Sequence, residues 1–258
     1  MASKRNRLQR TRAAVAARLA TPPEQPNVSL FTLPGPNGLR IRAAEAVDLA
    51  DFRRLCATAG VDIEDEIAAA IETGSAGEAV YTGLTSGIGA FFDDIMTRLD
   101  SMSVPALREL FLRLTVALVA ESDDTGVTGA ALAFPPVGII MNQLKQLRSL
   151  GASDETRVQL TLAGALRVSR IKAVAVRDDA RRSGVGSALV QACNSAFSQL
   201  GYSSIYGIMP PSIGLRMFYS GLGFTILPPG QPYTFAAAGL PTAVQADDGE
   251  QIFYLHPN

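Results

Sequence analysis

The stretch from Arg170 to Leu189 constrains the fold most, because it predicts a strand, a loop and a helix in immediate succession. Ala173 to Val176 is an apolar, Val-bearing run that predicts a buried strand. A polar turn and the hexapeptide RRSGVG follow, and a helical pattern then runs to Leu200. A strand that ends in such a loop points unpaired backbone N–H groups and the positive end of a helix dipole at one spot. That spot suits a phosphate group.

The residues of the hexapeptide favour a diphosphate ligand. Gly184 and Gly186 have no Cβ, so a pyrophosphate can lie directly against the backbone. Arg181 and Arg182 can add charge-assisted hydrogen bonds. A Rossmann-type dinucleotide site is disfavoured, because the loop lacks the first glycine of Gly-x-Gly-x-x-Gly and no acidic residue closely follows the next strand.

A second motif lies downstream, from Met217 to Phe224 (MFYSGLGF). With the glycine loop before it, this motif resembles the GNAT superfamily of acetyl-CoA-dependent N-acetyltransferases. The resemblance implies an α/β (α+β) fold, in which a central mixed, mostly antiparallel sheet is splayed at the cofactor site and flanked by helices. It also implies an acyltransferase that takes acetyl-CoA as cosubstrate and transfers the acetyl group to an amine by direct attack.

The resemblance assigns roles to particular residues. Backbone groups of the central strand would face the pantetheine arm and the acetyl group, and the loop would hold the pyrophosphate. Ser212 stands where the family commonly has an asparagine that touches CoA, and Tyr219 stands where the family has the acid that protonates the leaving thiolate. The implied cofactor-binding residues are Val174, Ala175, Val176, Arg181, Arg182, Ser183, Gly184, Val185, Gly186, Ser187 and Ser212.

The chemistry of Tyr219 agrees with that role, since an unperturbed phenol has a pKa of about 10 and stays protonated at neutral pH. The alternative is a core aromatic beside Phe218. The general base is open, because the two positions where relatives place a glutamate offer Lys172 on the central strand and Gly207 on the next. A water chain, Glu121 or Asp123 could serve, or the amine could arrive neutral. The lack of both glutamates also leaves a catalytically weak or inactive acyl-CoA-binding regulatory protein as an alternative.

Composition narrows the class of protein. The chain has 258 residues, of which 47% are hydrophobic and 18% charged, which is typical of a globular protein. No apolar stretch reaches the ~18 residues of a membrane-spanning helix, so a cytoplasmic protein without a membrane partner is expected. Cys56 and Cys193 fall in helical patterns and are interpreted as reduced core thiols. With His256 as the only histidine, no metal site is expected.

Charge is unevenly distributed along the chain. The first 19 residues hold six basic residues and no acidic one, which leaves 17 basic residues against all 24 acidic residues in the remainder. An acidic body would attract a cationic acceptor, either an amine-bearing small molecule or a peptide or protein amine. The basic tail is interpreted as a solvated segment, with an anionic partner as the alternative.

The domain organisation follows from proline and glycine. Residues 1–36 are expected to form the basic tail and a Pro-rich linker (Thr21 to Pro36), and residues 37–258 the acetyltransferase domain. Gly74 to Gly89 predicts a mobile loop. An insertion at about 137–164 is either a surface elaboration or a lid or homodimer contact. The excursion from Pro228 to Gly249 either covers the acceptor site or is disordered.

Overall fold

The protein is built around an eight-stranded sheet, seen in a computed structural model that describes residues 32–98 and 103–257. The strands lie in the order β1-β2-β3-β4-β5-β6-β10-β7, and every neighbouring pair is antiparallel except β5 and β6, which are parallel. The strands are β1 (Thr32–Pro34), β2 (Arg40–Ala43), β3 (Val116–Ser122), β4 (Gly126–Phe134), β5 (Val168–Val176), β6 (Ser204–Met209), β7 (Thr225–Ile226) and β10 (Gln251–Leu255). A mixed, mostly antiparallel sheet flanked by helices confirms the predicted fold class.

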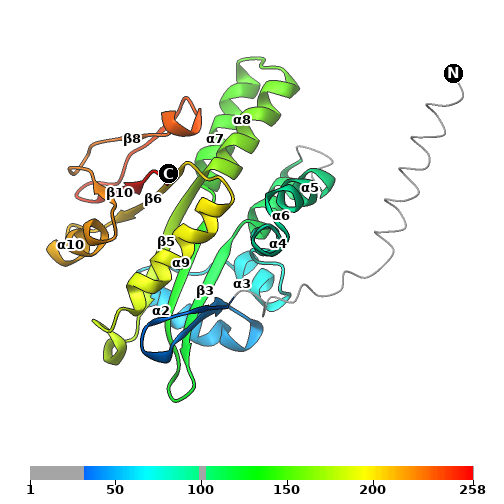
Figure 1. The fold of residues 1–258 in the computed structure, drawn as a ribbon. Coiled ribbons are helices and arrows are strands. Elements are labelled where there is room, and N and C mark those ends of the chain that lie inside the picture. The colour runs from blue at the N-terminus through cyan, green and yellow to red at the C-terminus, as the bar shows by residue number, and fades with distance from the viewer. Residues whose placement is uncertain (1–31, 99–102, 258) are drawn as a thin grey trace, which may run out of the picture.

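Helices cover both faces of this sheet (Figure 1). On one face, α9 packs Leu189 and Cys193 against Leu118 and Ala131 of the central strands. On the other, α2 and α3 bury Phe52 and other side chains against the small residues of β4 and β5. The helices are α2 (Leu49–Thr58), α3 (Asp65–Glu72), α4 (Glu78–Ser86), α5 (Ile88–Arg98), α6 (Val104–Arg113), α7 (Val137–Ser149), α8 (Asp154–Arg167), α9 (Val185–Gln199) and α10 (Ile213–Gly221).

The insertion before the central strand is a helical hairpin made of α7 and α8, which stand together at one end of the sheet (Figure 1). The polar segment after the first helix is itself helical, because Ser153 caps α8 by accepting a hydrogen bond from the Thr156 N–H. The interpretations of this insertion as a lid or as a homodimer contact stay predictions.

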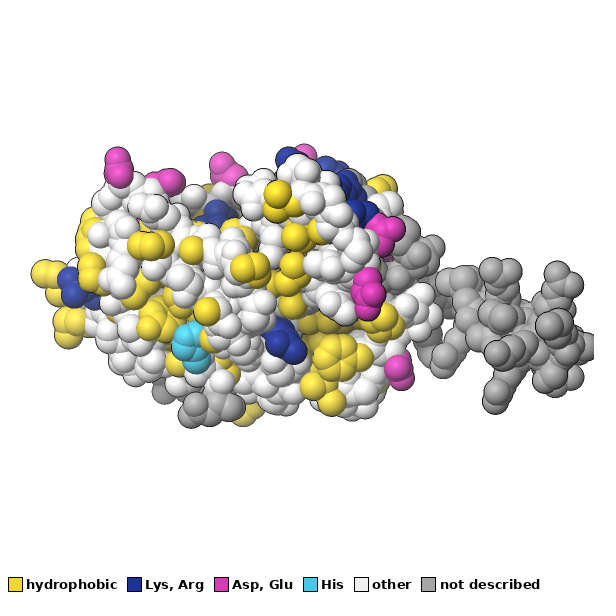
Figure 2. Space-filling model, turned by 90° about the horizontal axis from the view of Figure 1, so that it is seen from above, with side chains coloured by type: hydrophobic (Ala, Val, Ile, Leu, Met, Phe, Trp, Pro, Cys, Tyr) yellow, Lys and Arg dark blue, Asp and Glu magenta, His cyan; other side chains and the backbone are white. Residues whose placement is uncertain are grey.

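Seen from above (Figure 2), hydrophobic side chains form a broken band across the molecule, and acidic side chains stand at the rim of the molecule.

Two sequence predictions about local structure are wrong. Gly74 to Gly89 is largely helical rather than a mobile loop, since α4 buries Ala79, Val80 and Tyr81 in the main core. Gly83 within α4 is a packing requirement, because a Cβ there would lie 2.5 Å from the Leu200 side chain. The end of the Pro-rich segment also forms a strand, β1, which pairs with β2.

The excursion between β7 and β10 is ordered and packs on the sheet. Its two short strands, β8 (Tyr233–Thr234) and β9 (Ala243–Val244), pair with each other. Phe235 and neighbouring apolar residues form a separate cluster with Tyr206 and Ile252, on the sheet face opposite α9. Disorder is therefore excluded for this segment.

Several expectations concern features outside the sheet. Residues 1–31, which include the basic tail, lie outside the described residues. Both cysteines are free and buried, and burial raises the pKa of each thiol to about 12. Within residues 32–98 and 103–257, no helix is long and apolar enough to cross a membrane. No group of three metal-binding side chains gathers in that same part of the chain.

Candidate active site

The central feature of the site is a fork between the parallel strands β5 and β6. The two strands pair from Val168 and Ser204 as far as Ile171 and Gly207, and no pairing continues beyond. β5 nevertheless runs on to Val176, held on its other side by β4. One edge of β5 beyond Ile171 therefore presents backbone N–H and C=O groups to the open space instead of to a strand. An extended ligand with amide groups could pair with this edge as a strand would.

The glycine loop continues from the end of β5 to the start of α9, as the sequence predicts. Gly184 is the N-cap of α9 with φ +90°, a left-handed conformation that favours glycine. The first backbone bond inside the helix runs from the Ala188 N–H to the Gly184 carbonyl, which leaves the N–H groups of residues 185–187 without a helical acceptor. No side chain caps the start of α9. The start of α9 is thus open to an anion.

The two arginines of the loop differ in their surroundings. Arg181 forms an ion pair with Asp178 at 2.8 Å, and its Nε donates to the Val176 carbonyl at 3.4 Å. Arg182 adopts φ +62°, and it is the only non-glycine residue with positive φ in the part of the chain that the structure describes. This conformation costs roughly 1–2 kcal/mol and is typical of functional sites. Because Arg182 forms no ion pair within the described residues, its charge is available to a ligand.

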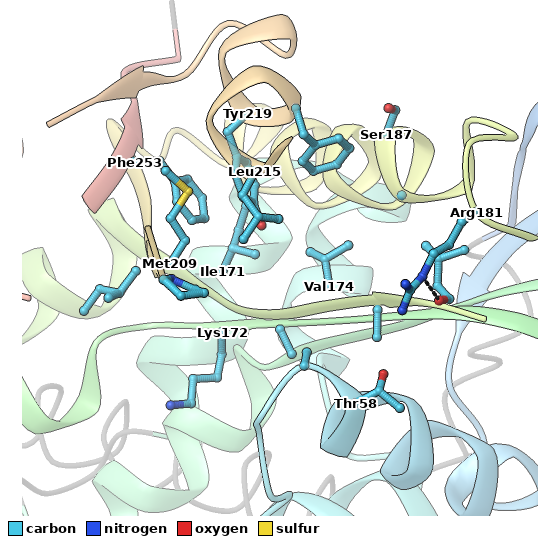
Figure 3. Close-up of a pocket in the computed structure, with 18 of the residues that line it drawn as sticks. Thr58, Ile171, Lys172, Val174, Arg181, Ser187, Met209, Leu215, Tyr219 and Phe253 are labelled. Atoms are coloured by element: carbon cyan, nitrogen blue, oxygen red, sulfur yellow. Dashed lines mark hydrogen bonds between the residues drawn. The ribbon is translucent and has the colours of Figure 1, made fainter. Parts of the chain in front are cut away.

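A cleft of about 960 Å³ joins the fork to the glycine loop. Figure 3 shows Val174, Leu215 and Tyr219 on one side of β5, with Ser187 and Arg181 further along. Apolar side chains line the part beside the fork, which suits the aliphatic portions of a pantetheine arm. Of the predicted residues, the cleft brings together Val174, Ala175, Val176, Arg181, Arg182, Gly184, Gly186, Ser187 and Tyr219.

Three predicted cofactor-binding residues do not line the cleft. The Ser183 hydroxyl donates to the Ala180 carbonyl at 2.5 Å, and Val185 is buried in the main core. Ser212 accepts a hydrogen bond from the Leu215 N–H and so caps α10, the helix that carries Tyr219. Their side chains support the loop and the helix from behind.

Tyr219 is held by aromatic packing on three sides. Its ring stacks on Phe253 with centroids 3.7 Å apart and makes edge contacts with Phe218 and Phe224. The residue is 7% exposed, and its hydroxyl bonds to no other described residue. Burial, with a smaller effect of Cys193, raises the pKa of the Tyr219 phenol above its usual value. The hydroxyl is therefore a fixed, protonated donor at the edge of the cleft.

The packing of Phe253 explains why β6 carries no glutamate at Gly207. A Cβ on Gly207 would lie 2.1 Å from Cζ of the Phe253 ring, so no larger residue fits beneath that ring. Phe253 in turn is the surface on which Tyr219 stacks. The position that could have held a base is thus used to place the tyrosine.

This packing makes a stability prediction. Gly207→Ala forces its methyl group into the Phe253 ring and should lower the free energy of unfolding by about 1–3 kcal/mol. Gly138→Ala is the control, because a Cβ at this position of α7 meets nothing within 4 Å and should leave stability unchanged or slightly raised. Urea unfolding followed by circular dichroism checks both; equal stability of the two variants would contradict the packing described.

The acidic residues considered as bases from the sequence are engaged elsewhere. Glu121 pairs with Arg40 and Arg42, and Asp123 pairs with Arg40 at 2.9 Å. Neither lines the cleft. Sequence reasoning instead missed Glu64 and Glu250. Their negative charges partly offset the lowering of the Lys172 pKa by burial and Arg170. The two glutamates lie before α3 and before β10, and no local motif marks them.

No family model and no curated protein matches the sequence. Several solved structures are similar to the chain at low sequence identity. An N-acetyltransferase from Staphylococcus aureus is 15% identical with a TM-score of 0.42, over 85% of this chain and 99% of that one. The ribosomal-protein-S18-alanine N-acetyltransferase from Escherichia coli is 12% identical with a TM-score of 0.42, over 85% and 94%. A GNAT family acetyltransferase from Elizabethkingia anophelis with acetyl-CoA bound is 13% identical with a TM-score of 0.35, over 64% and 89%.

Proposed function

We propose that this protein is an N-acetyltransferase of the GNAT type, which moves an acetyl group from acetyl-CoA to an amine. The observation that carries the proposal is the continuity of the cleft, from the fork between β5 and β6 to the uncapped start of α9. A strand edge that can pair with amide groups and a helix start that can bind a diphosphate match the two parts of CoA. They follow one another along the cleft in the order that the cofactor requires.

Acetyl-CoA as cosubstrate explains why the loop has a glycine at position 186. A Cβ on Gly186 would be in ordinary contact with Phe218 and Val176, both at 3.5 Å, so the protein's own packing does not require glycine there. The space is instead needed by a ligand that approaches the backbone closely. In this proposal the N–H groups of residues 185–187 and Arg182 bind the diphosphate, and the edge of β5 from Lys172 to Val176 binds the pantetheine arm.

Tyr219 acts as the general acid in this proposal. Its hydroxyl lines the cleft, and the three surrounding aromatic rings keep it at one position. The raised pKa keeps the phenol protonated, so it can donate its proton to the thiolate that leaves the acetyl carbon.

A second candidate function is a regulatory protein that binds acyl-CoA without transferring the acyl group. The observation in its favour is that no carboxylate and no histidine lines the cleft within the described residues. Measuring the release of free thiol from acetyl-CoA separates the two functions. The amines to test are spermidine, L-lysine and a hexapeptide with an N-terminal alanine. An enzyme releases thiol with at least one amine, whereas a binding protein shows saturable CoA binding and no release.

A competition experiment with NADH tests the alternative of a Rossmann-type dinucleotide site. NADH should not compete with CoA for the cleft.

A further inference from the structure

We propose that Lys172 is the general base of the transfer, acting from the side of β5 opposite Tyr219. This inference rests on the proposed function and adds the group that removes the proton from the attacking amine. It comes from the local geometry of β5, from the side chains that line the cleft and from the use of lysine in this chain.

Lys172 lies at a point of β5 where the pairing with both neighbouring strands is interrupted. It is the first residue of β5 beyond the last pair with β6, Ile171 and Gly207. On the other side, the register with β4 passes from Ile171 to Ala173 and omits Lys172, which makes it the extra residue of a β-bulge. Lys172 therefore has no paired residue on either neighbouring strand. Bulges often turn a side chain toward an active site.

The bulge places Lys172 on the side of β5 opposite Tyr219. Ile171 belongs to the core beneath α9, and Ala173 belongs to the core beneath α2 and α3, so the strand changes face at this point. Figure 3 shows Lys172 and Thr58 on one side of β5 and Tyr219 on the other. A thioester held at the fork would thus lie between a proton donor on one face and an amine base on the other.

Elimination among the side chains that line the cleft gives the same assignment. The titratable residues there are Lys172, Arg181, Arg182 and Tyr219. An arginine does not lose its proton in a protein, and Tyr219 is the acid. Among the described residues that line the cleft, Lys172 is thus the only one whose side chain can present a neutral nitrogen to the amine.

The residues around Lys172 favour that neutral form. Burial and the charge of Arg170 lower the pKa of the Lys172 amine, and Glu64 and Glu250 oppose this shift in part. Within the described residues Lys172 forms no ion pair that would fix it as a cation. The carboxylates of Glu64 and Glu250 would attract a cationic amine toward the cleft.

The composition of the chain also singles out this lysine. The sequence holds three lysines, Lys4, Lys145 and Lys172, against 20 arginines. A lysine at the fork in a chain that otherwise uses arginine fits a role that needs proton loss, since lysine shifts its pKa readily on burial and arginine does not.

The step balances as a direct transfer. The acceptor nitrogen bonds to the acetyl carbon, the C–S bond breaks with its electron pair on sulfur, and the thiolate takes the proton of the Tyr219 hydroxyl. A cationic acceptor first gives one proton to the neutral Lys172 amine, which frees its nitrogen for the attack. The second proton of that nitrogen, lost as the amide forms, passes to the Tyr219 phenolate, and Lys172 gives its proton to water.

Lys172→Arg and Lys172→Met test the assignment together, with Lys145→Arg of α7 as the control. If Lys172 is the base, both of its variants should lower kcat for spermidine or L-lysine about 100-fold or more, while the Kd for acetyl-CoA is unchanged. Transfer to hydroxylamine, which is neutral at pH 7, should be affected little. If Lys172 only supplies positive charge, Lys172→Arg keeps the wild-type rate, and the proposal is overturned.

A second measurement does not depend on the acceptor. Competitive labelling with acetic anhydride across pH, read by mass spectrometry, should give Lys172 a lower pKa than the exposed Lys145. Equal pKa values for the two lysines would overturn the base assignment even if the protein acetylates amines. Failure of the wild type to bind acetyl-CoA would instead refute the proposed function itself.

Discussion

Gly186→Glu is expected to weaken acetyl-CoA binding by about 100-fold or more. A loss of this size corresponds to one or two charge-assisted hydrogen bonds to phosphate. The carboxylate would lie where the diphosphate meets the start of α9, and like charges would repel. The folded protein should not suffer, because position 186 has no positive φ and an acidic residue at a helix N-terminus is favourable. Isothermal titration with acetyl-CoA measures the affinity, and thermal unfolding measures the stability.

Gly186→Gln is the matched control, since it adds nearly the same bulk without the charge. We expect it to bind acetyl-CoA more tightly than Gly186→Glu, with a difference that shrinks as salt is added. Gly184 is a less suitable target, because its φ of +90° makes any replacement strained whatever the ligand does. Wild-type affinity in Gly186→Glu would contradict the placement of the diphosphate.

Tyr219→Phe is expected to lower kcat about 100-fold and to leave the Kd for acetyl-CoA unchanged. The variant removes only the hydroxyl, and the ring still stacks on Phe253. Because burial raises the pKa of this phenol, the wild-type rate should show no loss from ionisation of Tyr219 up to about pH 10, the pKa of an exposed tyrosine. Rates of thiol release across pH check both statements.

Tyr202→Phe controls for the loss of a buried tyrosine hydroxyl. Tyr202 donates to the Ala165 carbonyl at 3.0 Å, away from the cleft, so this variant should lose about 1 kcal/mol of stability and keep its kcat. Equal rates in the wild type and Tyr219→Phe would remove Tyr219 from the mechanism.

The parts of the candidate site whose local structure the sequence predicts are those carried by adjacent residues. The loop from Arg181 to Ser187 lies within a few positions of the strand before it, so a single pattern of glycine, arginine and helix start is sufficient. Tyr219 is similarly marked by the aromatic and glycine residues next to it. The central strand and the hairpin of β3 and β4 follow from short apolar runs.

The parts that sequence misses depend on contacts between distant segments. Gly207 is explained only by Phe253, a residue near the other end of the chain. The orientation of Lys172 depends on a bulge, which is a matter of register with β4 rather than of local composition. The glycines of the segment that contains α4 suggested a loop, but Gly83 is required where that helix packs against Leu200. Tertiary packing there outweighs the low helix propensity of glycine.

The most direct test of the central claim is a crystal structure of the protein with CoA. We expect the diphosphate against the N–H groups of residues 185–187 and beside Arg182, and the pantetheine arm along the free edge of β5 from Lys172 to Val176. A complex in which CoA lies outside the fork, with the start of α9 unoccupied, would contradict the account.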